Sequence, residues 1–418
     1  MNSRTPMSSR APKIEPDSVP PREAGAGEAH KPRIDLKVAL AAAFATFYLP
    51  LGIQMPYLPL WLQHRGLDPQ EIGIAIAVPL VTRLFATPVL GFLSDRMGRP
   101  RAVLTTLALM TTLTTGLLAL CVDPLTIFIV AGLIAISWNP SFALLDSYAS
   151  RQARAGRVDY GRSRQWGSGA FLVANVLGGV VITATGAGSV VLWIVLGHLC
   201  YLLVSLTLPE LPPPPRPAHH EQGRERVPLV LALGVVAVAL VQASHALLYA
   251  FASVHWRAEG WSLTTIGLLW ATGVAAEIVL FRFGTRLMGR FGPFQLIVLG
   301  GFAALLRFGV MAFDPPLALL FPLQLLHGFT FGATYLGMVE MVARGVSAHR
   351  SGSGQSLAAW TVNIFMSAAT VASGPLWVAM GAKAFAVSAG LGLLGAVLAL
   401  ALRRRVGWPQ PQSSGVGG

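Results

Sequence analysis

Long runs of apolar residues recur along the whole chain, and short polar segments separate them. The hydrocarbon core of a bilayer is roughly 30 Å thick, so a helix needs about 20 apolar residues to cross it. Runs of this length are typical of membrane-spanning helices, whereas the short alternation of barrel strands is absent. The pattern predicts twelve spans, at residues 36–62, 70–93, 101–121, 125–148, 163–184, 188–208, 228–254, 263–287, 294–313, 316–343, 354–378 and 382–402.

Composition agrees with a membrane protein, because 54% of the 418 residues are hydrophobic and only 12% are charged. A chain this apolar is not expected to be an ordinary soluble domain. The formal net charge of +13 would also suit a nucleic-acid-binding protein. The placement of the basic residues along the chain distinguishes this class from a membrane protein.

Nearly all of the 31 Lys and Arg residues lie in the two tails and on alternate connecting segments, and the other side carries only Arg65, Arg257 and Lys383. This is the positive-inside pattern, which predicts cytoplasmic termini and no nucleic-acid partner. Two basic residues, Arg83 and Arg307, fall inside predicted spans. A charge at such depth is costly and usually functional.

A Pro-rich polar segment is the only long interruption between spans, and it divides the twelve into six and six. We therefore expect a disordered cytoplasmic tail at 1–35, a six-helix bundle at 36–208, a cytoplasmic linker at 209–227, a second bundle at 228–402 and a cytoplasmic tail at 403–418. Neither a Walker A motif nor a cluster of metal ligands is present in the sequence. We expect no metal and no cofactor, with the proton as coupling ion.

A basic turn follows the second span, with the spacing G-x-x-x-D-R-x-G-R. It contains the predicted signature and gating residues Gly91, Asp95, Arg96, Gly98 and Arg99. A similar segment, 284–292, follows the second span of the second half. The turn resembles the signature loop of the major facilitator superfamily. The resemblance implies an all-α membrane protein, with twelve helices in two pseudo-symmetric six-helix bundles.

The segment 160–168, Tyr-Gly-Arg-Ser-Arg-Gln-Trp-Gly-Ser, resembles a segment of lactose permease and other oligosaccharide:proton symporters. The resemblance places Asp146 on their sugar-binding carboxylate, Arg164 on their sugar-binding arginine and Phe171 on their stacking tryptophan. A structural ion pair between Asp146 and Arg164 is the alternative interpretation.

Three ionisable residues, Glu277, Arg307 and His327, lie inside spans of the second half. The same resemblance places Arg307 and His327 on residues that take part in proton coupling. The symporters carry a glutamate where this chain has Thr330, so we infer that Glu277 takes over as the protonatable carboxylate. A purely structural pair between Glu277 and Arg307 is the competing interpretation.

Other segments are similar to the 3-phenylpropionate permease family, and they comprise residues 56–62, 244–246, 266–271 and 326–332. Within them, His245 and Trp270 are candidate substrate contacts, with a packing role for His245 as the alternative. Arg83 lies near the membrane centre, where it could attract a carboxylate.

We therefore predict a monomeric transporter of the bacterial inner membrane that takes up a small organic acid, such as an aromatic monocarboxylate, with a proton by alternating access. A proton-driven exporter of hydrophobic compounds is one alternative. A membrane receptor or accessory protein that moves no solute is another. We do not expect an enzyme, because the sequence shows no catalytic constellation.

Overall fold

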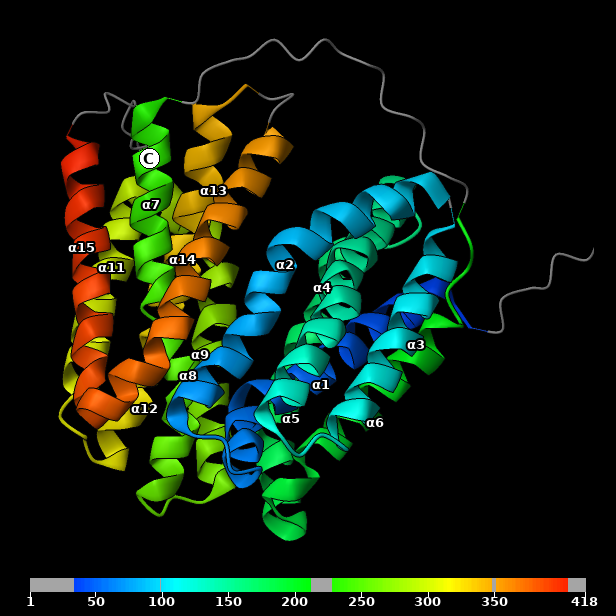
Figure 1. Ribbon diagram of the computed structural model, residues 1–418. Coiled ribbons are helices and arrows are strands. Elements are labelled where there is room, and N and C mark those ends of the chain that lie inside the picture. Colours follow the sequence, from blue (N-terminus) through cyan, green and yellow to red (C-terminus); the bar gives the residue numbers. More distant parts are fainter. Residues whose placement is uncertain (1–33, 98, 212–227, 348–350, 405–418) are drawn as a thin grey trace, which may run out of the picture.

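Figure 1 shows the computed structural model of the chain, which describes residues 34–97, 99–211, 228–347 and 351–404. These residues form helices and connecting turns, with no β-strand among them. Eleven helical segments in these ranges are long and apolar enough to cross a bilayer. Large apolar side chains such as Leu113, Ile129 and Val397 are exposed on the outside, as expected for a surface that lipid covers. The chain is thus a multi-pass membrane protein.

Some predicted features lie outside the described residues. They are most of the tail 1–35, nearly all of the linker 209–227, most of the tail 403–418, and Gly98 of the signature turn.

The first group of helices lies together on the right of Figure 1. It consists of α1 (Leu36–His64), α2 (Pro69–Met97), α3 (Pro100–Leu118), α4 (Pro124–Arg154), α5 (Tyr160–Thr185), the turn η1 (Ala187–Ser189) and α6 (Val190–Ser205). Two helices begin after an aspartate that accepts a backbone N–H at 3.0 Å: Asp123 from Thr126 and Asp159 from Arg162. The hydroxyl and amide of Thr126 also hold the pKa of the Asp123 carboxyl below its usual range.

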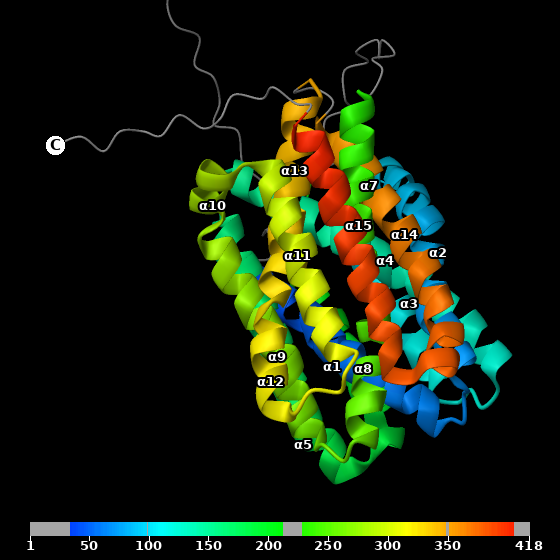
Figure 2. The same ribbon diagram turned by 90° about the vertical axis from the view of Figure 1, so that its left-hand side faces the viewer.

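The second group begins with α7 (Leu229–Ala243), α8 (Ala246–Ala258), α9 (Leu263–Arg282), α10 (Gly284–Phe291) and α11 (Pro293–Met311). It continues with α12 (Leu317–Leu325), the π-helical turn η2 (Gly328–Ala333), α13 (Thr334–Gly345), α14 (Ser351–Met380), the turn η4 (Gly381–Ala384) and α15 (Phe385–Arg403). Helices α11 and α15 lie side by side in both views (Figure 1, Figure 2).

Two predicted spans of this group are interrupted well inside the span, and a third, 263–287, is broken near its end at Phe283, between α9 and α10. The span 228–254 is broken at Ser244 and His245, between α7 and α8, and the span 316–343 contains η2. π-Helical turns are rare and are often found at functional sites. The two interruptions well inside the spans carry residues of the candidate site described below.

The two groups touch along α2 with α14 and along α5 with α9. Gly73 near the start of α2 packs on the backbone of Gly374 near the end of α14, and Gly374 in turn packs on Gln70. Gly267 near the start of α9 packs on the carbonyl of Asn175 in the second half of α5. Both contacts therefore lie at one face of the molecule, which we call the opposite face. We call the other face, where α1 begins and α15 ends, the terminal face.

Tyr57 of α1 connects these elements at the opposite face. Its side chain is fully buried, and its hydroxyl lies 2.5 Å from the carbonyl oxygen of Asn175 and 3.2 Å from that of Leu263. One side chain thus contacts backbone from both groups. In Figure 1 the groups meet toward the bottom and are farther apart toward the top.

Candidate functional site

A cavity of about 500 Å³ lies between the two groups of helices, and residues from both groups line it. Its size is typical of a site for a small organic molecule. Most of the wall is apolar. The aromatic residues in it are Trp138, Tyr249, Phe331 and Tyr335. The main polar residues in it are Gln54, Arg83, Thr115, Asn139, His198, Gln242, Asn363 and Thr370.

Arg83 of α2 is the only Lys, Arg, Asp or Glu among the described residues that line the cavity. Its side chain is exposed, and no described carboxylate forms an ion pair with it. A guanidinium presents several N–H donors and binds carboxylates well, often through two parallel hydrogen bonds. The cavity therefore offers one cationic contact in mainly apolar surroundings.

Arg164 of α5 and Asp146 of α4 do not line the cavity and do not pair with each other. Arg164 donates a hydrogen bond to the hydroxyl of Tyr48, and its guanidinium carbon lies 4.5 Å from the centre of that ring. Asp146 accepts a hydrogen bond of 2.5 Å from the hydroxyl of Tyr160. The structural ion pair considered as an alternative is absent, because each charge has its own tyrosine.

A buried polar network surrounds Arg307 of α11, whose side chain is 1% exposed. Its guanidinium lies 3.2 Å from Nδ1 of His327 and 3.3 Å from the hydroxyl of Thr330, and it donates to the side-chain oxygen of Gln324. Nε2 of His327 lies 3.8 Å from Oε2 of Glu277. The direct pair between Glu277 and Arg307 is therefore absent, since His327 lies between them.

The neighbours of His245 and His327 determine which ring nitrogen of each histidine carries the proton. A guanidinium only donates, so Nδ1 of His327 has to accept from Arg307, and Nε2 carries the proton toward Glu277. Nδ1 of His245 faces the carbonyl oxygen of Gln242 at 3.0 Å and has to donate to it. Nε2 of His245 then accepts from the hydroxyl of Thr330 at 2.9 Å. Two neutral imidazoles thus satisfy the network.

One layer of aromatic side chains separates this network from the cavity. The Phe331 ring stacks on His327 with centroids 5.4 Å apart, and the Tyr249 ring stacks on His245 at 5.7 Å. Both aromatic residues line the cavity, whereas neither histidine does. The network is thus close to the cavity, and His245 holds a hydrogen-bonded packing position.

Two other predicted substrate contacts also lie outside the cavity lining. Trp270 is buried, and its indole N–H donates to the hydroxyl of Ser253 at 2.9 Å. Phe171 is buried, and its backbone packs against Gly52 of α1. Both side chains are therefore packed among the helices outside the cavity lining.

The segment that the sequence predicts as a basic turn after the second span is mostly helical in the structure. Gly91, Asp95 and Arg96 belong to the last two turns of α2, which continues to Met97. Arg99 is exposed and immediately precedes α3.

Several polar residues of the site were not singled out from the sequence. Tyr48, Tyr160 and Gln324 bind the predicted charges, and His198 and Asn139 line the cavity. Tyr160 lies three residues before the predicted span 163–184, and the others lie within predicted spans. Listing every polar side chain of the spans, rather than the charged ones alone, would have included all of them except Tyr160.

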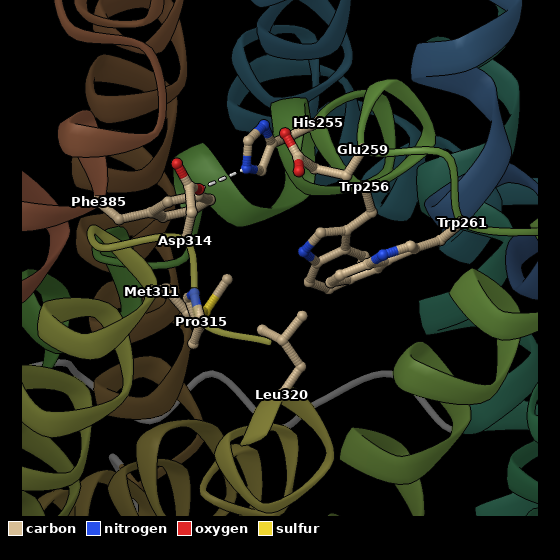
Figure 3. A pocket seen from close by; sticks show the side chains of 9 residues that line it. All are labelled: His255, Trp256, Glu259, Trp261, Met311, Asp314, Pro315, Leu320 and Phe385. Carbon is tan, nitrogen blue, oxygen red and sulfur yellow. Dashed lines mark hydrogen bonds and ion pairs between the residues drawn. The ribbon is translucent and has the colours of Figure 1, made fainter. Parts of the chain in front are cut away.

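A second, much smaller pocket of about 20 Å³ lies among the ends of α8 and α11 and the starts of α12 and α15 (Figure 3). Its wall includes His255 and Asp314, whose Nε2 and Oδ1 atoms lie 2.7 Å apart. The volume is about that of one water molecule, so this pocket is too small for an organic substrate.

Comparison with known proteins relates this chain to membrane transporters. The chain is 27% identical over 308 residues to a probable 3-phenylpropionic acid transporter of Escherichia coli K12, a match that covers 73% of this chain and 81% of the relative. It is 24% identical over 302 residues to the maltose permease of Geobacillus stearothermophilus, covering 71% and 76%.

Solved structures share the fold. The nucleoside transporter NupG matches with a TM-score of 0.74 at 18% identity, over 90% of this chain and 100% of that one. A D-xylose-proton symporter matches with a TM-score of 0.69 at 13% identity, over 90% and 98%. The model of the MFS_1 like family matches residues 37–387. The chain therefore belongs to the MFS_1 like family and is a major facilitator transporter rather than an enzyme.

Proposed function

We propose that this protein takes up a small organic acid, an aromatic monocarboxylate, in symport with a proton. Arg83 carries the proposal, because it is the one charged side chain among the described residues that line a large, mainly apolar cavity. An anion that leaves water for such a site needs a cationic partner, and Arg83 can supply it. A carboxylate with an apolar remainder fits these surroundings.

The aromatic part of the substrate follows from the rest of the wall. Trp138, Tyr249, Phe331 and Tyr335 come from both groups of helices and line the cavity, and aromatic rings pack well against one another. The relative named as a probable 3-phenylpropionic acid transporter supports the same class of substrate.

We further propose twelve spans in two pseudo-symmetric six-helix bundles, 36–208 and 228–402, of a monomer in the bacterial inner membrane. In this arrangement α7 with α8 forms one broken span, as does α12 with α13, while α14 and α15 are separate spans. The basic residues assign the terminal face to the cytoplasm. The contacts at the opposite face then correspond to a carrier that is closed on the outside, and transport requires the bundles to rock about the cavity.

Glu277 is the proposed proton carrier. Nε2 of His327 lies 3.8 Å from its Oε2, and the charge of Arg164 acts on it from the other bundle. Protonation would remove the attraction between Glu277 and Arg164 and thereby change the relative free energies of the carrier conformations. Coupling requires that proton and substrate favour the same conformation.

The proposal is tested with purified protein in liposomes that carry an inward proton gradient. We expect accumulation of 3-phenylpropionate by the wild type, little by Arg83→Ala, and partial transport by Arg83→Lys. The neutral 3-phenylpropanamide is the matched probe and should bind at least tenfold more weakly to the wild type. Binding of sugars or nucleosides without carboxylates would contradict the substrate class. Accumulation only in everted vesicles would contradict uptake, and binding without any flux would favour a receptor.

A further inference from the structure

Asn363 of α14 presents an accessible and unpaired amide to the cavity. The residue is partly exposed and lines the cavity. Its backbone carbonyl accepts a hydrogen bond from the hydroxyl of Ser367, whereas its side-chain amide has no partner among the described residues. The amide of Asn175 is also unpaired, but its atoms are sealed from solvent, and those of Asn363 are not. A ligand in the cavity can therefore reach Asn363.

The other residues by which α14 lines the cavity offer no free polar group. Thr370 is 1% exposed, and its hydroxyl donates to the carbonyl oxygen of Met366 at 2.8 Å. The remaining cavity-lining residues of this helix are apolar, and they are Ala359, Val362 and Met366. Asn363 is thus the side chain through which α14 can hydrogen-bond to a ligand.

Arg83 and Asn363 lie at the same depth in the membrane. The antiparallel helices α2 and α14 are in contact near the opposite face, where Gly374 packs on Gln70 and Gly73 packs on Gly374. Counted from this contact toward the terminal face, Arg83 lies roughly 15–20 Å along α2 and Asn363 roughly 17 Å along α14. The two side chains are therefore level with each other.

The two helices that carry these residues are neighbours. Helices α2 and α14 run side by side from the opposite face in both views (Figure 1, Figure 2). The axes of packed helices lie roughly 8–10 Å apart. A carboxylate between two such helices is within reach of a long arginine side chain from one and of an asparagine amide from the other.

The chemistry of the pair suits a carboxylate. The guanidinium of Arg83 and the amide nitrogen of Asn363 supply N–H donors, and a carboxylate has two oxygens that only accept. The amide is neutral, so it leaves the positive charge of Arg83 available to a ligand. An aspartate at the same position would pair with that charge instead.

We propose that Asn363 is a second contact for the carboxylate of the substrate, so that this carboxylate bridges α2 of the first group and α14 of the second. This inference rests on the proposed function and adds a specificity-determining residue to its site. Bridging connects substrate binding with the relative position of the two groups, because a conformation that moves Asn363 away from Arg83 loses one of the two contacts.

Binding to the purified protein in detergent, measured by calorimetry, tests the inference with 3-phenylpropionate and the neutral 3-phenylpropanamide as probes. Asn363→Leu should weaken binding of the acid by about tenfold and that of the amide by much less, because hydrogen bonds to charged groups are the stronger ones. Asn363→Asp keeps the shape of the side chain and should remove nearly all preference for the acid, because the new carboxylate pairs with Arg83.

Thr361→Val is the matched control on the same helix, because that exposed hydroxyl bonds only to its own helix and does not line the cavity. This variant should keep the preference for the acid. Unchanged binding of the acid by Asn363→Leu and Asn363→Asp would overturn the inference and leave the role of Arg83 intact. An equal loss of both probes in these two variants would show a structural role and also overturn it. A wild type without any preference for the acid would overturn the proposed function itself.

Discussion

Nε2 of His327 lies 3.8 Å from Oε2 of Glu277, while Nδ1 of the same ring lies 3.2 Å from the guanidinium of Arg307. The imidazole therefore separates the carboxyl from the cation. Glu277 can change its charge without leaving Arg307 unpaired, because Gln324 and Thr330 also bind that guanidinium. This arrangement suits a carboxyl that gains and loses a proton during transport.

Glu277→Gln should uncouple transport from the proton gradient. The amide has the shape of a permanently protonated carboxyl, so exchange of labelled substrate should continue while accumulation driven by a pH gradient falls by about tenfold or more. Both rates are measured in proteoliposomes. Glu340→Gln, on an exposed pair in α13, is the control and should accumulate substrate normally. Undiminished accumulation by Glu277→Gln would exclude Glu277 as the proton carrier.

Thr330→Val should destabilise the protein. The substitution keeps the shape but removes the hydroxyl that donates to His245 and accepts from Arg307. It leaves two buried groups short of a partner, which costs roughly 1–3 kcal/mol each in such sites. The melting temperature in detergent should fall clearly. Thr361→Val is the control, because that exposed hydroxyl bonds only to its own helix. Equal melting temperatures for the two variants would contradict the network.

Gly374→Ala should disfavour the conformation described here. A Cβ atom at this position would lie 2.7 Å from the carbonyl oxygen of Pro69 and 2.7 Å from Cα of Gln70. Overpacking of this kind costs roughly 1–3 kcal/mol, so the carrier should shift toward a state that is open at the opposite face. Spin-label distances between α4 and α13 at the terminal face should shorten. Gly169→Ala, where a Cβ meets no atom within 4 Å, should leave the distances unchanged.

Tyr57→Phe should also destabilise the contacts between the two groups at the opposite face, but by less than Gly374→Ala. The variant keeps the ring and loses the hydroxyl that contacts the carbonyl oxygens of Asn175 and Leu263. Loss of one such hydrogen bond costs about 1 kcal/mol, which changes a conformational equilibrium about fivefold. The same spin-label pair reports it. A shift larger than that of Gly374→Ala would contradict this order of effects.

The apolar runs were sufficient to predict most of the helices. The predicted span 70–93 corresponds to α2, and 263–287 covers α9 and part of α10, because lipid demands long apolar helices whatever their neighbours are. The breaks at His245 and at Gly328 were not predicted. They depend on hydrogen bonds with other helices, which an apolar run does not encode.

The sequence by itself determined that this is a membrane protein of many spans and that Arg83, Glu277, Arg307 and His327 lie within them, because the cost of burying charge is a property of the chain in lipid. Only the tertiary structure decided which of these side chains share a site. Each residue turns a helix by about 100°, so small changes in helix rotation decide that Arg83 lines the cavity, that Trp270 lies behind its wall and that His327 separates Glu277 from Arg307.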